Sequence, residues 1–89
     1  MTGCETLAKR LCLRKTPSPR EVEQALFKLT YPSPEELERA RDILCHHFGL
    51  LGYPKLTLRT IGERWHRSAE RIRQIEGQTL RQLLDVRRL

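Results

Sequence analysis

The sequence predicts an all-α protein: a small bundle of four to five helices that ends in a helix-turn-helix and has no winged elements. Two observations predict this fold. Apolar residues recur at intervals of three and four in several segments, which is the spacing of one helix face. Helix start signals, in which a serine precedes a proline and lies three residues before a glutamate, come before two of these segments. With 89 residues, the chain has room for one small domain.

Residues 1–16 are a basic leader, and we expect the main domain over residues 17–89. The apolar residues of the leader allow a short basic amphipathic helix: they are Leu7, Ala8, Leu11 and Cys12. Such a helix could pack on the domain, contact phosphates or bind a partner, and the sequence leaves all three roles open.

The next helix begins after a clear start signal. Ser18 is the expected N-cap, Pro19 the first helical position, and Glu21 completes a capping box with the serine. The spacing of the apolar residues that follow predicts a helix of about ten residues. They are Val22, Ala25, Leu26 and Leu29.

The same start signal recurs and predicts a longer helix. Ser33 is its expected N-cap, and Glu36 is placed to close a second capping box. Gly49 is placed to end this helix in a left-handed conformation. The apolar stripe between these ends consists of Leu37, Ala40, Ile43, Leu44, His47 and Phe48.

A connector over residues 50–55 leads to a short helix capped by Thr57. Gly62 in this helix allows another backbone to approach closely. The buried side of the short helix is expected to consist of Leu58, Ile61 and Trp65.

Residues 66–68 are too few for anything but a tight turn, and Ser68 can cap the last helix, which should run to about Leu84. Two helices of about eight and sixteen residues joined by a three-residue turn make a helix-turn-helix. The apolar face of the last helix is expected to consist of Ala69, Ile72, Ile75, Thr79, Leu80 and Leu83.

The charge of the chain favours a polyanionic partner. The net charge is +6 and the pI is about 9.8. Residues 1–16 carry a net +3, residues 17–56 a net −1 and residues 57–89 a net +4. All eight cations of the last segment are arginines, which suit two-pronged contacts with phosphate or guanine.

Seven residues of the last helix lie off its apolar face: Glu70, Arg71, Arg73, Gln74, Gly77, Gln78 and Arg81. All but the first arginine are spaced by three and four, so these six share one face. Arginine can pair with guanine, glutamine with adenine and glutamate with the amino group of cytosine. The residue types therefore fit a base-reading face, although exposed helices that only meet solvent carry the same types.

The chain also resembles a known family, region 4 of the sigma-seventy class of bacterial sigma factors. The most specific part of the resemblance is the run ERIRQIE at residues 70–76, followed by LRQL at residues 80–83. In this family, region 4 reads the minus-35 promoter element with the second helix of the motif and docks on the flap of the RNA polymerase beta subunit. The similarity covers roughly residues 20–85 and includes residues 25–30, 46–50, 56–65 and 68–76.

The resemblance implies roles for individual residues. Glu70 and Gln74 fall on base-reading positions, and Arg73 falls near the DNA. Thr57 and Leu58 open the helix that crosses the DNA backbone. The candidate DNA-binding residues are Thr57, Leu58, Arg67, Ser68, Ala69, Glu70, Arg71, Arg73, Gln74, Gln78 and Arg81.

Three departures from the family pattern bear on base preference. Ala69 stands where the family has an arginine that reads guanine, and losing this contact should weaken discrimination at one base pair by about 1–3 kcal/mol. His66 and Arg67 replace small turn residues, and Gln78 replaces a common lysine. We therefore expect a sequence preference that is weak or different from the housekeeping one.

Nothing in the sequence resembles the sigma regions that bind the polymerase clamp or melt the start site. We therefore expect either an excised domain or a small sigma-like regulator from a phage or mobile element, and the initial methionine and the leader favour the regulator. The alternative function is a polymerase-binding module, encoded by a phage or mobile element, that modulates transcription with little or no base reading.

A metal site is disfavoured. The candidate ligands are Cys4, Cys12, Cys45, His46 and His47. Zinc takes four ligands in a defined geometry, whereas adjacent residues 45–47 on one helix point in three directions. Cys45 and His47 are expected to pack between helices, and His46 is expected at the surface.

Other function classes also lack support in the sequence. We find no catalytic grouping, phosphate-binding loop or small-molecule site, so we expect no enzyme and no cofactor. The three cysteines form no CxxC pair and are expected to be reduced. No apolar run approaches the roughly 20 residues that span a bilayer, and there is no signal peptide, so we expect a cytoplasmic protein without a membrane partner.

Overall fold

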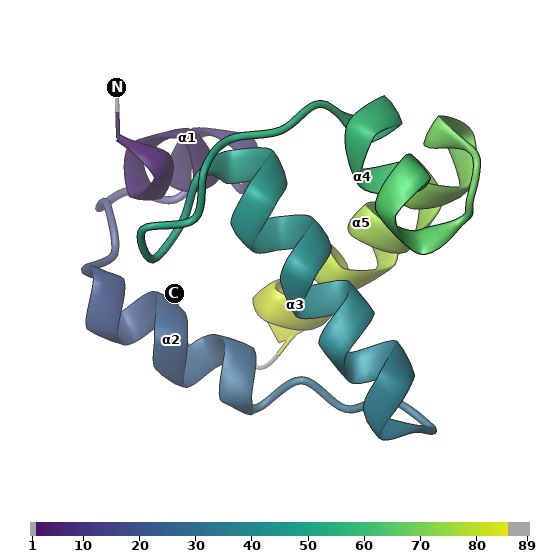
Figure 1. Cartoon of the computed structure of the whole chain (residues 1–89). Helices are drawn as coiled ribbons and strands as arrows, with labels where there is room; N and C mark the ends of the chain where they lie inside the picture. Colours follow the sequence, from purple (N-terminus) through teal and green to yellow (C-terminus); the bar gives the residue numbers. More distant parts are fainter. Residues whose placement is uncertain (1, 86–89) are drawn as a thin grey trace.

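Five helices and no strands make up residues 2–85, the part of the chain that the computed structural model describes. The helices are α1 (Gly3–Arg10), α2 (Pro19–Phe27), α3 (Pro34–Phe48), α4 (Leu58–Trp65) and α5 (Ala69–Asp85). Helices α1, α4 and α5 all pack against α3 (Figure 1). This arrangement confirms the predicted all-α bundle that ends in a helix-turn-helix. Residue 1 and residues 86–89, the outer ends of the two predicted segments, lie outside the described residues.

The predicted start signals of α2 and α3 are used, but not in the same way. At α2, the Ser18 hydroxyl accepts from the Glu21 amide at 3.2 Å, and the Glu21 carboxylate accepts from the Ser18 amide at 3.0 Å. This is the expected capping box. At α3, the Ser33 hydroxyl accepts from the Glu36 amide at 3.2 Å, but the carboxylate accepts from the serine hydroxyl at 3.3 Å. The second box therefore lacks its bond to the N-cap amide.

Helix α1 forms in the leader and packs on the rest of the chain. Thr2 and Glu5 make a capping box that starts it. The side chain of Leu7 is fully buried and that of Leu11 is nearly so. Cys12 is exposed, because the chain has already turned away from the helix axis at this residue. Of the three roles left open for the leader, packing is thus the one its apolar side chains fulfil.

Three helices end at a residue with left-handed backbone geometry: Cys12 after α1, Gly49 after α3 and His66 after α4. Gly49, with φ 66° and ψ 46°, adopts the predicted conformation. At Cys12, φ is 57°. Its amide donates to the Lys9 carbonyl at 3.2 Å, and the next amide, of Leu13, donates to the Ala8 carbonyl at 2.9 Å. These two bonds are a Schellman motif, which usually has glycine at the left-handed position.

The apolar core consists of two clusters. The larger cluster joins α1 and α2 to one end of α3 and of α5, and contains Leu7, Leu11, Val22, Ala25, Leu26, Leu29, Leu44, Cys45, Phe48, Leu50, Leu80 and Leu83. The smaller cluster joins α3, α4 and α5 through Ile43, Ile61, Ile72 and Ile75, and we call it the isoleucine cluster. Leu58 and Trp65, predicted as buried, are only half-buried at its edge. Helices α3 and α5 contribute to both clusters and so connect them.

Polar contacts of α3 add to this packing. The Asp42 carboxylate accepts from the Trp65 indole N–H at 2.7 Å and from the Arg64 guanidinium at 3.2 Å. His47 Nδ1 contacts the carboxylate of Glu76 on α5. These contacts attach both helices of the helix-turn-helix to α3. His46 is 7% exposed and was wrongly predicted at the surface, because its ring lies between the Asp42 carboxylate and the connector.

The segment after α2 is attached to the second half of α5. The Gln82 side-chain amide accepts from the Thr30 amide and donates to the Thr30 carbonyl, both at 3.0 Å. The Tyr31 hydroxyl bonds to the Thr79 hydroxyl.

None of the helices within residues 2–85 is long and apolar enough to cross a membrane.

Replacing Cys12 by glycine should stabilise the protein. A non-glycine residue in the left-handed conformation is strained, and the cysteine side chain is exposed, so Cys12→Gly should raise the free energy of unfolding by about 1 kcal/mol. Urea unfolding followed by circular dichroism measures the change. Cys12→Ala is the control, because it removes the thiol but keeps the strain. An equal gain in both variants would show that the backbone geometry is not the cause.

Removing the Asp42 carboxylate should loosen α4 from α3. Asp42→Ala deprives the Trp65 indole and the Arg64 guanidinium of their acceptor, so we expect a loss of about 1–3 kcal/mol in the free energy of unfolding. Trp65 is the only tryptophan, so its fluorescence should also shift to longer wavelength in the folded variant. Glu63→Ala, which removes a 73% exposed carboxylate, should change neither quantity. Unchanged fluorescence in Asp42→Ala would contradict the contact.

Candidate nucleic-acid interface

Helices α4 and α5 form the predicted helix-turn-helix, separated by the turn at residues 66–68 (Figure 1). His66 adopts a left-handed conformation with φ 55° and ψ 45°, and the Arg67 amide then donates to the Gly62 carbonyl at 2.9 Å. A Cβ atom at Gly62 would clash with the carbonyl oxygen of Arg67. The close backbone approach predicted at this glycine is therefore confirmed, and it makes the turn tight.

Both helices of the motif begin at their predicted caps. The Thr57 hydroxyl accepts from the Thr60 amide at 3.2 Å, and the Ser68 hydroxyl accepts from the Arg71 amide at 3.1 Å. Both cap residues are exposed. Leu58, the first residue of α4, packs against the isoleucine cluster. The start of α4 thus offers an exposed threonine and backbone amides, which are groups that can contact a phosphate.

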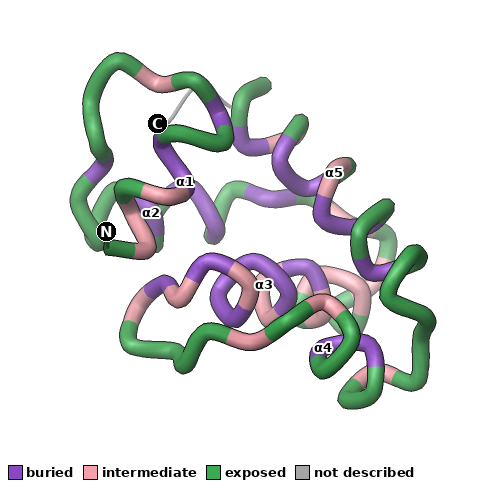
Figure 2. Tube along the Cα trace, turned by 90° about the horizontal axis from the view of Figure 1, so that it is seen from above, coloured by how far each residue is buried: buried purple, intermediate pink, exposed green. Residues whose placement is uncertain are grey.

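Along α5, exposed positions alternate with buried ones (Figure 2), and the exposed positions of one face carry polar side chains over most of the helix. They are Glu70, Arg71, Arg73, Gln74, Gln78 and Arg81. Gly77, predicted on the same face, is half-buried. The opposite face is held by the isoleucine cluster and by the larger cluster. The exposure predicted from residue spacing is therefore confirmed for these six side chains, whose types can pair with base edges or phosphates.

Side chains on this face are paired along the helix. The Arg73 guanidinium donates from Nε to the Glu70 carboxylate at 3.0 Å, and its Nη2 lies 2.5 Å from the other carboxylate oxygen. This hydrogen bonding lowers the pKa of the Glu70 carboxyl and raises the pKa of the Arg73 guanidinium. Arg71 Nη1 donates to Gln74 Oε1 at 3.4 Å. The face is thus organised before any ligand binds, with Glu70 ionised at neutral pH.

The turn residue Arg67 makes contacts that the sequence analysis missed. Its Nη1 donates to the carbonyls of Trp65 and His66, both at 3.2 Å. These carbonyls are at the end of α4, where no amide of the same helix is left to donate to them. Arg67 remains exposed, so its guanidinium both covers the end of α4 and presents positive charge at the turn.

Two residues of α5 differ from the predicted apolar face. Ala69 is exposed, because it is the first residue of the helix and precedes the part that packs on α3 and α4. Glu76 takes a place on the buried face and is 3% exposed. A glutamate is not expected on a buried face, because its carboxylate is charged. Here the contact with His47, which is distant in the sequence, accommodates the carboxylate.

The candidate metal ligands do not converge. Among the described residues, no three histidine, cysteine, aspartate or glutamate side chains are placed to hold one ion. Cys45 is buried as predicted, and burial raises the pKa of its thiol to about 11. Forming the thiolate that binds a metal is therefore harder at Cys45 than at an ordinary cysteine.

Comparison with known proteins agrees with this geometry. No solved structure matches the chain. The sequence does match the family described as sigma-70, region 4, over residues 37–84, which is more than half of the chain. The match takes in most of α3 and the whole of α4, and it ends one residue before the last residue of α5. A chain with this match and with a helix-turn-helix exposing a polar second helix belongs to the sigma-70 region 4 family, whose members are DNA-binding regulatory domains.

Proposed function

We propose that this protein is a sequence-specific transcription regulator that reads promoter DNA with α5 and contacts bacterial RNA polymerase, at the flap of its beta subunit. The observation that carries the proposal is the exposed polar face of α5, on a helix whose other face is fixed in the core. A helix of this kind fits the major groove of B-form DNA. The polymerase contact is supported by membership of the family.

The arrangement of the face suggests how its residues divide the work. Glu70 and Gln74 lie one turn apart near the start of α5, where recognition helices contact bases. The ionised Glu70 carboxylate only accepts hydrogen bonds, so it would favour the amino group of cytosine and disfavour the acceptor edge of guanine. Gln74 would pair with adenine. Both residues must exchange their present arginine partners for DNA, which leaves Arg71 and Arg73 free for phosphates.

Other exposed residues would position the protein on the duplex. Thr57 and the first backbone amides of α4 suit a phosphate on one side of the groove, and Leu58 holds this end of the helix in the core. Arg67 and Ser68 lie at the turn, and Gln78 and Arg81 lie two and three turns along α5. Phosphate contacts of this kind give affinity without base preference.

Ala69 favours a second candidate function. Its exposed side chain is a single methyl group at the start of α5, where it has no group to donate to guanine. A protein with this deficit could bind polymerase, modulate transcription and read bases little or not at all. A phage or mobile element is the kind of source that we propose for either regulator.

Direct DNA reading predicts different outcomes for two neighbouring variants. Gln74→Ala should change the preferred base at one position, with a loss of about 1–3 kcal/mol in discrimination. Arg71→Ala should weaken binding to all sequences alike, because a phosphate contact is not specific. Selection of bound duplexes from a random pool measures both effects. Gln24→Ala is the matched control, because it changes an exposed glutamine on α2, outside the helix-turn-helix, and it should bind like the original protein.

Duplex binding should also fall steeply with salt. Each phosphate contact releases counterions, so the logarithm of the binding constant should decrease by about 0.9 per contact for each unit of log salt concentration. The same titration with purified RNA polymerase core tests the second candidate. If the protein binds polymerase but shifts no duplex at any salt concentration, it is a polymerase-binding module and the DNA-reading proposal is wrong.

A further inference from the structure

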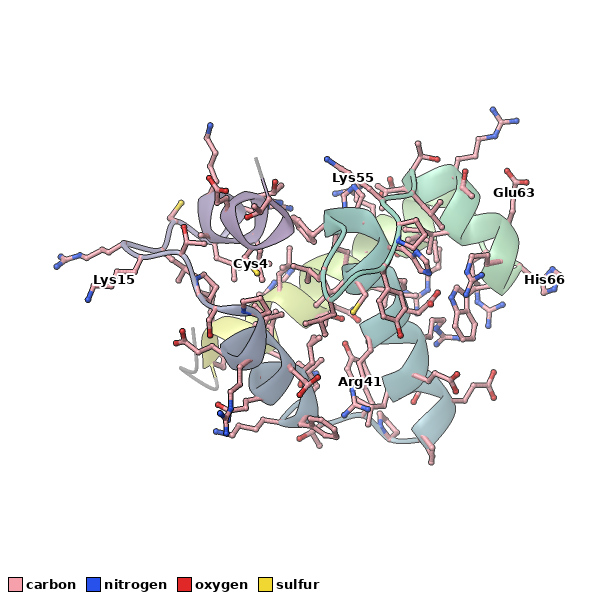
Figure 3. The ribbon with its side chains drawn as sticks, turned by 60° about the vertical axis from the view of Figure 1, so that its left-hand side comes forward. Cys4, Lys15, Arg41, Lys55, Glu63 and His66 are labelled. Carbon is pink, nitrogen blue, oxygen red and sulfur yellow. The ribbon has the colours of Figure 1, made fainter. Side chains whose placement is uncertain are left out.

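A second surface lies at the opposite end of the molecule from the helix-turn-helix turn. Figure 3 shows Lys15 projecting at one end and His66 at the other. Beside Lys15 lies a groove of about 730 Å³ between the α1–α2 loop, the start of α2 and the end of α5. Its lining consists of residues 11–17, Glu21 and Leu84. Most of this lining precedes residue 37, where the family match begins, so the groove lies mainly outside the matched residues.

The floor of the groove is apolar. Leu11 and Pro17 are buried beneath it, and Leu13 is half-buried. Leu84 is 42% exposed and is one of three large apolar side chains that lie exposed among the described residues. An exposed leucine beside a concave apolar floor is a feature of protein docking sites.

The rim of the groove is basic. Arg14 and Lys15 are both exposed, and neither makes an ion pair with any residue in the described range 2–85. Glu21 is the one acidic residue of the lining, and its carboxylate accepts from the Ser18 amide in the capping box of α2. The positive charge of the rim is therefore available to an external partner.

The loop that forms the groove is held in place by local hydrogen bonds at both of its ends. The Schellman motif at Cys12 fixes its beginning, and the Ser18–Glu21 capping box fixes the end. Pro17 restricts the backbone between them and is buried. A preformed groove loses little conformational entropy when a ligand binds.

We infer that this groove is a docking site for an acidic amphipathic helix of a partner protein. Apolar side chains of such a helix would cover Leu13 and Leu84, and its acidic residues would face Arg14 and Lys15. Nucleic acid fits less well, because no aromatic side chain lines the groove to stack on a base. On α5, Leu84 at the groove lies 14 residues after Glu70 at the start of the proposed base-reading face, which is about 21 Å of helix. The protein could thus hold DNA and this partner together.

The test uses the full chain and a fluorescent 18-residue peptide with leucines on one helical face and glutamates on the other. Fluorescence anisotropy should show binding that weakens with salt. The double variant Arg14→Glu/Lys15→Glu should lower the affinity by about tenfold or more. Leu84→Ser should lower it by a similar factor, because it removes the exposed apolar contact. A peptide with lysines in place of the glutamates should bind far more weakly.

Matched controls separate the groove from the rest of the surface. Arg59→Glu reverses an 89% exposed charge on α4, and Phe27→Ser removes a 71% exposed apolar side chain on α2. Neither should change peptide binding, and circular dichroism of every variant checks that it is folded. The inference is overturned if folded groove variants bind the peptide like the original protein, or if both peptides bind equally.

The inference does not depend on DNA reading, and duplex binding distinguishes the two. The double variant should keep its duplex affinity while it loses the peptide. If it instead loses duplex affinity and keeps the peptide, the leader contacts nucleic acid and the docking site is wrong. A changed base preference in Gln74→Ala and weaker duplex binding in Arg71→Ala, with peptide binding intact in both, support the independence of the two surfaces.

Discussion

The packing of four isoleucines between α3, α4 and α5 fixes the direction in which α5 faces. Ile72 and Ile75 are the only large apolar residues in the first half of α5, and both meet Ile43 and Ile61 in this cluster. Because the side chains three and four residues apart share a face, burying these two isoleucines leaves Glu70, Arg73 and Gln74 exposed. The candidate recognition face is therefore a consequence of the core.

Polar contacts then select one orientation among those that apolar packing allows. Asp42 binds the indole and the guanidinium of α4, and His47 meets the buried carboxylate of Glu76 on α5. Buried polar groups are costly when unpaired, so any rotation of the helix-turn-helix that separated these partners would be disfavoured. Helix α3 thus holds both helices of the motif in place. Because α5 also ends at the groove, the same contacts help to fix the position of Leu84.

Most of the helix ends could be predicted because their signals are local. Ser18, Ser33, Thr57 and Ser68 cap helices through bonds to residues only three positions away, and Gly49 ends α3 within its own turn. The exceptions have local reasons as well. Cys12 and His66 adopt left-handed conformations although neither is a glycine. At Ser33, the Glu36 carboxylate accepts from the serine hydroxyl and not from the serine amide, so the capping box is incomplete.

The sequence by itself determined the helices, the three-residue turn and the residues that α5 exposes, because spacing along one helix decides which side chains share a face. Only the tertiary structure decided which polar residues are buried. Glu76 is buried because His47, 29 positions away in the sequence, contacts its carboxylate. His46 is buried because its ring bonds to the Pro54 carbonyl in the connector. The groove beside Leu84 likewise exists only because the leader and the end of α5, at opposite ends of the sequence, close one core.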